Sequence, residues 1–371
     1  MKKLICFTLL FVSVYLNAQN ENGLWKKSNS NKVIINDEKS NFPRENIFNL
    51  DFESLKKALK TSPKRDISNK NSKTIITLPT VDGKIEKFEV YENSVLAPEL
   101  AAKFPEIKSY VAVGVDNPSV RAFLSSSPLG FKAMIVYPNK ETTFIEPISS
   151  DKMTYSIYKT TDHKKAFNKF DCNSDHDVTD FTNQISNNST ILMRGADDSK
   201  LRTYRLAVSC TGEYATYFGG TKALALAGIV NTMTRVNALF ERDFGVRLVL
   251  VTNNDSIIFT DATLDPYTTV SNIHTELNNC LNTNVGDANY DLGHLFDSVR
   301  GGGSSVCIGC VGISNYKGKA YSSTTLIPEG DQFDVNMVSH EMAHQLGGNI
   351  LLHTLRKVVI SHKWSQEVGL Q

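Results

Sequence analysis

Residues 340–344 have the sequence His-Glu-Met-Ala-His, and Gly347 follows three positions later. Histidines four residues apart lie on one face of an α-helix, so their imidazoles can reach a single metal ion. Gly347 predicts an abrupt end of that helix, because glycine readily adopts the left-handed conformation that turns the chain away. We expect Asp334 or Asn336 to cap the start of the helix. The stretch therefore predicts a short helix that carries two metal ligands and then breaks.

The histidine pair suits zinc, which accepts nitrogen ligands and is catalytic where three protein ligands leave a position for water. Glu341 follows the first histidine and is placed to take a proton from that water and to pass it to a leaving amine. The alternative is an exposed helix face that carries the same letters by chance. The helix break at Gly347, together with the export signal at the N-terminus, favours a Zn2+ site. His340 and His344 are then its ligands, and Glu341 is the general base.

The first residues have the features of a secretory signal peptide. Lys2 and Lys3 precede an apolar run over residues 4–16, and small residues near Ala18 offer a cleavage site. The run is shorter than the roughly 20 residues that span a membrane. We therefore expect a signal peptide over residues 1–18 and a secreted, extracellular protein without a membrane span.

Length and charge limit the remaining possibilities. The chain of 371 residues has room for two domains, and its net charge is +1, from 40 basic and 39 acidic residues. This balance gives no indication of a nucleic-acid partner.

The pattern of apolar and polar residues along the chain changes near residue 199. Residues 19–198 begin with a polar stretch and one short helix near residues 55–59. Alternating apolar residues and turns then predict strands, and a polar linker closes this part. Residues 199–349 alternate strands and helices before the histidine helix, which indicates an α/β (α+β) domain.

Within this second part we expect a long helix over residues 221–245 that ends at Gly245. The glycine-rich stretch 301–305 predicts a loop, and the apolar residues of 306–314 predict a fourth strand.

Five cysteines remain once Cys6 leaves with the signal peptide, and an odd number in an oxidising compartment implies one specially used thiol. The close pair Cys307 and Cys310 indicates a disulfide or two buried thiols, because no second pair completes a zinc knuckle. Cys172 lies in the polar linker and is either a structural thiol or a latency switch. As a switch, its thiolate occupies the open zinc position until cleavage of the linker, for example near Arg194. The other four cysteines are then an even set able to form two disulfides.

The histidine helix, with residues 331–339 before it, resembles that of the metzincin clan, whose pattern is H-E-x-x-H-x-x-G-x-x-H. Residues 202–248, 287–298 and 301–313 resemble the reprolysin-like, or adamalysin-type, secreted bacterial metallopeptidases, and 87–114 is similar to their propeptide. The resemblance covers about residues 75–349.

The resemblance implies a metzincin-like catalytic domain with a mixed twisted sheet and long helices, preceded by a strand-rich propeptide domain. It implies zinc ligation by His340 and His344, Glu341 as general base, and protein or peptide substrates. It also implies that the fourth strand, with Ile308 and Val311, is the edge along which substrate lies as an added strand.

The resemblance fails at the end of the motif. Ile350 stands where the pattern has its third histidine, and no methionine follows for the Met-turn of the family. One set of explanations takes the third ligand from later in the chain, from His353, His362 or Glu367. We favour a reading-frame slip, since one base restored before this position, in one choice of ordinary codons, gives the histidine. Residues 350–371 are then an aberrant tail, and the chain is truncated and impaired.

The sequence thus predicts a secreted zinc endopeptidase, made as a zymogen and monomeric. The alternative is a catalytically inactive peptide-binding remnant of the same fold, which a zinc titration distinguishes. An adhesin or structural surface protein would need repeats or a β-sandwich pattern, and the sequence shows neither.

Overall fold

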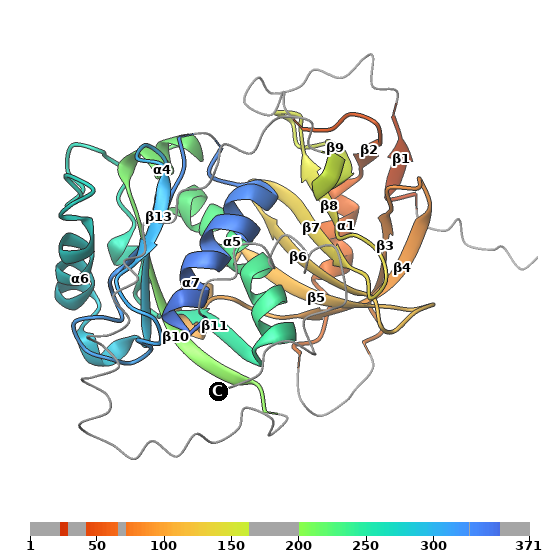
Figure 1. Cartoon of the computed structure of the whole chain (residues 1–371). Helices are drawn as coiled ribbons and strands as arrows, with labels where there is room; N and C mark the ends of the chain where they lie inside the picture. The colour runs from red at the N-terminus through yellow and green to blue at the C-terminus, as the bar shows by residue number, and fades with distance from the viewer. Residues whose placement is uncertain (1–22, 29–41, 66–71, 163–199, 326, 349–371) are drawn as a thin grey trace, which may run out of the picture.

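The computed structural model describes residues 23–28, 42–65, 72–162, 200–325 and 327–348 (Figure 1). The predicted signal peptide, Cys172 with its linker, and the tail from residue 350 lie outside these ranges.

The residues before 163 form a nine-stranded sheet, here called the N-terminal sheet. Its strands are β1 (Trp25–Lys27), β2 (Ile47–Leu50), β3 (Ile75–Pro79), β4 (Ile85–Glu92), β5 (Lys108–Gly114), β6 (Arg121–Ser127), β7 (Gly130–Val136), β8 (Thr143–Pro147) and β9 (Thr154–Lys159). All pairs are antiparallel, in the order β1-β2-β9-β8-β7-β6-β5-β4-β3, so each strand from β3 to β9 pairs with the next. Antiparallel neighbours that follow one another in the chain, mostly through short connections, form a meander. The predicted strand-rich first part is confirmed.

Two α-helices and one short 3-10 helix accompany this sheet: α1 (Phe52–Leu59), α2 (Pro98–Lys103) and η3 (Thr160–Asp162). Asp51 caps α1, because its side chain accepts a hydrogen bond from the Ser54 backbone amide at 3.0 Å. Pro98 begins α2, where its fixed φ angle suits the first helical turn. The short helix predicted near residues 55–59 is thus present as α1.

The residues after 199 form a five-stranded sheet, here called the C-terminal sheet. Its strands are β10 (Arg202–Cys210), β11 (Val246–Leu250), β12 (Leu292–Asp297), β13 (Gly302–Ser305) and β14 (Ala320–Ser323). The order is β11-β10-β12-β14-β13; all pairs are parallel except β13 with β14, which is antiparallel. The α/β prediction is confirmed at the level of fold class.

Helices cover both faces of the C-terminal sheet. They are α4 (Gly212–Tyr217), α5 (Lys222–Asp243) and α6 (Ile273–Asn284), with the 3-10 turns η4 (Asn254–Ile257) and η5 (Asp287–Asn289). Successive residues of a strand point to opposite faces, so Leu206 packs in the core around α5, whereas Ala207 packs in the core around α6.

Helix α5 lies between the two sheets, in contact with β5 and β6 on one side and β11 on the other (Figure 1). It is buried from Ala225 to Phe240, as expected of a helix that is apolar on more than one face. By length and composition α5 could cross a membrane, but 89% of its apolar window is buried within the protein, as in a core helix. Gly245, with φ of 60°, follows its end as predicted.

Two sequence predictions about the edge of the C-terminal sheet are wrong. The stretch 301–305 was expected to be a loop, but most of it is the edge strand β13. The stretch 306–314, with Ile308 and Val311, was expected to be the fourth strand, but it lies outside every strand. A Cys307–Cys310 disulfide closes this segment into a turn, and Gly309 and Gly312 have φ angles of 75° and 72°, far from extended backbone.

Candidate metal centre

The histidine motif lies on a helical segment of two parts. A π-helix, η6 (Asp331–Val338), begins after Gly330, whose φ is 89°, and continues into α7 (Ser339–Gln345). The prediction that Asp334 or Asn336 caps the helix is wrong, because both lie inside η6. Asp334 is fully buried, and its carboxylate accepts from Arg235 Nη1 at 2.8 Å and from Thr232 Oγ1 at 2.7 Å. An extended π-helix is rare, and π-turns are frequent at functional sites.

His340 and His344 turn the same ring nitrogen toward one point. Their Nε2 atoms are 3.1 Å apart, and the two side chains are nearly fully buried. Two nitrogens bound to one tetrahedral zinc ion, each about 2.0–2.1 Å from it, are about 3.3 Å apart. The spacing of the pair therefore fits zinc.

The protonation of the pair also fits a metal ligand. His344 Nδ1 lies 2.9 Å from the Gly348 carbonyl oxygen, so Nδ1 is the donor, and in the neutral tautomer Nε2 is the nitrogen that carries the metal-binding lone pair. Burial, and then the neighbouring His344, lower the pKa of His340 to about 4. His340 is consequently neutral at neutral pH, which is the form that binds metal.

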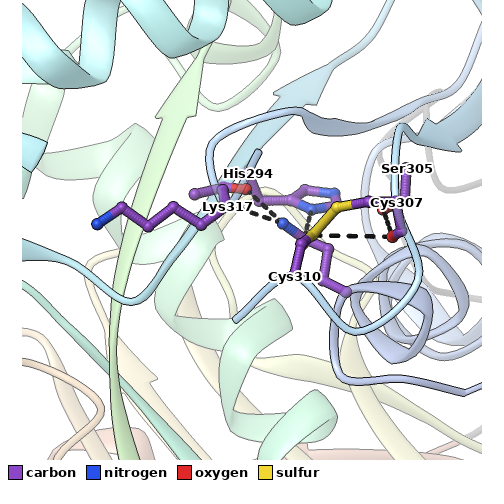
Figure 2. Close-up of a disulfide and its surroundings, with 7 residues drawn as sticks. His294, Ser305, Cys307, Cys310 and Lys317 are labelled. Atoms are coloured by element: carbon purple, nitrogen blue, oxygen red, sulfur yellow. Dashed lines mark hydrogen bonds between the residues drawn. A yellow bond between two sulfur atoms is a disulfide. The ribbon is translucent and has the colours of Figure 1, made fainter. Parts of the chain in front are cut away.

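The end of α7 is held by a turn around the disulfide, shown in Figure 2. The Gly309 amide donates to the His344 carbonyl at 2.9 Å, and the Ser305 hydroxyl donates to the Cys307 carbonyl at 2.8 Å. Gly347 has φ of 100° directly after the helix, so the predicted break is confirmed. A hydrogen bond from the disulfide turn thus fixes the backbone of the second histidine.

Glu341 lies against the edge strand β13. Its side chain is fully buried, and a Cβ atom added to Gly303 would be 2.7 Å from Glu341 Cγ. Only a glycine leaves room for the carboxylate side chain at this place in the strand. This contact explains the glycine at position 303 within a strand.

Gln345 and His294 hold the motif helix to the sheet, and neither residue stands out in the sequence. Gln345 Nε2 donates to the carbonyls of Gly293 and Lys317, at 3.0 and 3.1 Å. Its Oε1 is therefore the acceptor for His294 Nδ1 at 3.2 Å, and Ser322 Oγ lies 3.0 Å from His294 Nε2. No local motif marks these contacts, because they join positions 51 and 28 residues apart.

The described residues do not complete a three-ligand site. They contain no group of three or more His, Cys, Asp or Glu side chains that could hold a metal. Ile350, the candidate substitutes His353, His362 and Glu367, and the proposed thiol ligand Cys172 all lie outside the described ranges.

The cysteines follow the sequence prediction only in part. The expected Cys307–Cys310 disulfide is present. Cys210 and Cys280 are buried free thiols, so these four cysteines do not form the two disulfides that the switch hypothesis allowed. Their positions on β10 and α6 give each an apolar environment, and burial raises the pKa of both thiols.

Comparison with known proteins agrees with this site. Residues 200–355 match the sequence model of the family described as Metallo-peptidase family M12B Reprolysin-like. The match spans β10 to α7, including Glu341 and the histidine pair, and confirms the reprolysin-like resemblance drawn from the sequence. No curated protein matches the chain.

Proposed function

We propose that this protein is a secreted zinc-dependent endopeptidase, made as a zymogen, which hydrolyses peptide bonds. The observation that carries the proposal is the convergence of two imidazole nitrogens, 3.1 Å apart, beside a buried glutamate at the edge of a sheet. The family match supports a metallopeptidase, whose substrates are proteins or peptides.

The residues present fit a zinc ion, which His340 Nε2 and His344 Nε2 would hold together with a third ligand from outside the described residues. When bound, zinc polarises a substrate carbonyl and lowers the pKa of a water toward 7. Glu341 takes the proton of that water as its oxygen attacks the peptide carbonyl carbon. It then gives the proton to the amide nitrogen as the C–N bond breaks, which releases a carboxylate and an amine.

The proposed position of the peptide is along β13. This strand is the antiparallel edge of the C-terminal sheet, and an extended peptide can add to such an edge through backbone hydrogen bonds. Gly303 places Glu341 directly beside the edge. This role replaces the one expected of Ile308 and Val311, which lie in the disulfide turn.

The proposal also includes export, latency and a monomeric state. These parts of it come from the sequence alone. The apolar run after Lys2 and Lys3 supports export, and Cys172 remains the candidate thiolate for a latency switch. The proposal keeps position 350 as the place of the third zinc ligand. The family pattern has a histidine there, and this chain has isoleucine.

The proposal is tested with Glu341→Gln, in the chain as it stands and with Ile350→His added. We expect hydrolysis of a peptide library to fall about 10²- to 10⁴-fold, as for the loss of a general base, while bound zinc is unchanged. Glu53→Gln, an exposed change on α1, is the control and should leave both quantities unaltered. Hydrolysis by the Glu341 variant near the parent rate would show that this carboxylate is not the base.

A further inference from the structure

Five charged side chains form a buried network where the N-terminal sheet meets the segment before the histidine helix. Lys132 on β7 and Glu146 on β8 come from the N-terminal sheet, whereas Arg235 on α5, Glu329 and Asp334 follow the linker. All five side chains are at most 3% exposed. We call these five residues the charge network.

Two contacts of the network cross between the two parts of the chain. Glu146 pairs with Arg235 Nη2, and Lys132 Nζ pairs with Glu329. The remaining pairs lie within each part: Lys132 Nζ is 3.2 Å from Glu146 Oε2, and Arg235 Nη1 is 2.8 Å from Asp334 Oδ2. The four contacts therefore link both parts into one chain of alternating charge.

Neutral groups also contact the members of this chain. Tyr217 donates to Glu329 at 2.9 Å, and the Arg235 guanidinium lies 5.2 Å from the centre of the Phe144 ring, two residues before Glu146. Burying a charge is costly unless it is paired and hydrogen-bonded. A surface can cover Arg235 and Glu329 at low cost only if it presents a carboxylate to Arg235 and a cation to Glu329.

The affinity for such a surface comes from the apolar contacts around the network. One hydrophobic core contains Phe123 and Met134 of the N-terminal sheet together with Val230 and Met233 of α5. The backbone adds to this contact, because Leu250 of β11 donates to the Val95 carbonyl at 2.8 Å and accepts from the Ala97 amide at 3.0 Å. The part of the chain before residue 163 thus extends the core through its sheet and extends the edge of the C-terminal sheet through the segment between β4 and α2.

We propose that the part of the chain before residue 163 stays bound to the part after residue 199 when the linker between them is cut, and that Lys132 and Glu146 determine this fit. The interaction is between two pieces of the same chain and does not depend on peptidase activity. A cut in the linker then gives a two-chain complex, and release of the first piece is a separate step.

The test uses the full chain with a site for a sequence-specific protease inserted between residues 163 and 199. After cutting, we expect the two pieces to co-elute, with a dissociation constant of about 1 μM or tighter. Glu146→Gln leaves Arg235 short of one partner, and we expect it to raise the dissociation constant about 100-fold or more. Lys103→Met is the control, because its pair with Asp255 also crosses between the pieces but is exposed; we expect a change below about fivefold.

A second set of variants separates the network from a general loss of fold. Lys132→Met leaves Glu329 buried without a cation, and Glu329→Gln leaves Lys132 with Glu146 as its one remaining carboxylate partner in the network. The double variant removes both charges. We expect the double variant to bind more tightly than either single variant, or to be soluble where they are not. The proposal is overturned by pieces of the parent chain that separate on cutting, by equal effects of Glu146→Gln and Lys103→Met, or by additive losses in the double variant.

Discussion

The histidine pair and the charge network meet on one helical segment, where Asp334 of the network lies six residues before His340, and the two groups are built in opposite ways. His340 and His344 direct two nitrogens toward one point, so an added cation would complete the pair. In the charge network each charge faces an opposite one, so it is complete without a ligand. Burial alone therefore does not identify a functional site; convergence of like groups does.

The largest effect that this comparison predicts is on stability, from removal of the central cation of the network. Arg235→Met leaves Glu146 and Asp334 buried without their guanidinium partner. We expect the free energy of unfolding, measured by urea denaturation of the full chain, to fall by about 3–5 kcal/mol.

Arg205→Met is the matched control, because Arg205 pairs with Asp291 but has a side chain that is 52% exposed. Here we expect a loss of about 1 kcal/mol or less. Equal losses for the two arginine variants would show that burial does not distinguish their ion pairs.

The same comparison shows what the sequence can predict. The two histidines and Gly347 were identified because a helix brings together residues four apart and because a helix break requires a glycine. Arg235 is 89 residues from Glu146 and 99 from Asp334, and no local pattern encodes such contacts. Strand β13 was missed for a related reason, since Gly303 is required by a side chain from another element, Glu341.

A smaller effect is predicted for the histidine pair, which should gain stability only when metal is added. Zinc at about 100 times its dissociation constant should raise the free energy of unfolding by about 2.7 kcal/mol. His344→Ala should abolish this gain, whereas Glu341→Gln should keep it. Equal stabilisation of the His344 variant would place the metal elsewhere.

The family pattern sharpens this prediction at position 350. Ile350→His should tighten zinc binding at least tenfold, or about 1.4 kcal/mol, because it supplies the third histidine of the pattern. His353→Ala and Glu367→Ala test the substitute ligands in the unaltered chain. A loss of zinc affinity in either would contradict the frame-slip hypothesis.

The last prediction concerns His294, which belongs to neither group but joins the motif helix to the sheet. Burial lowers the pKa of His294 from 6.5 to about 3, and its neutral form satisfies both Gln345 and Ser322. The unfolded chain therefore binds a proton at this residue between about pH 6.5 and 3, and the folded chain does not. Its contribution to stability is complete above pH 6.5 and is lost as the pH falls, at up to about 1.4 kcal/mol per pH unit.

His294→Asn tests this dependence, because the asparagine amide can still donate to Gln345 but does not titrate. Asp334, whose pKa burial raises to about 6, acts with the opposite sign over part of this range, since the folded chain binds its proton first. That contribution is common to the parent and the variant, so it cancels in their difference. We expect the difference in unfolding free energy between parent and variant to shrink as the pH falls from 6.5 toward 4. Parallel stability curves over this range would mean that His294 carries the same charge in the folded and unfolded chains.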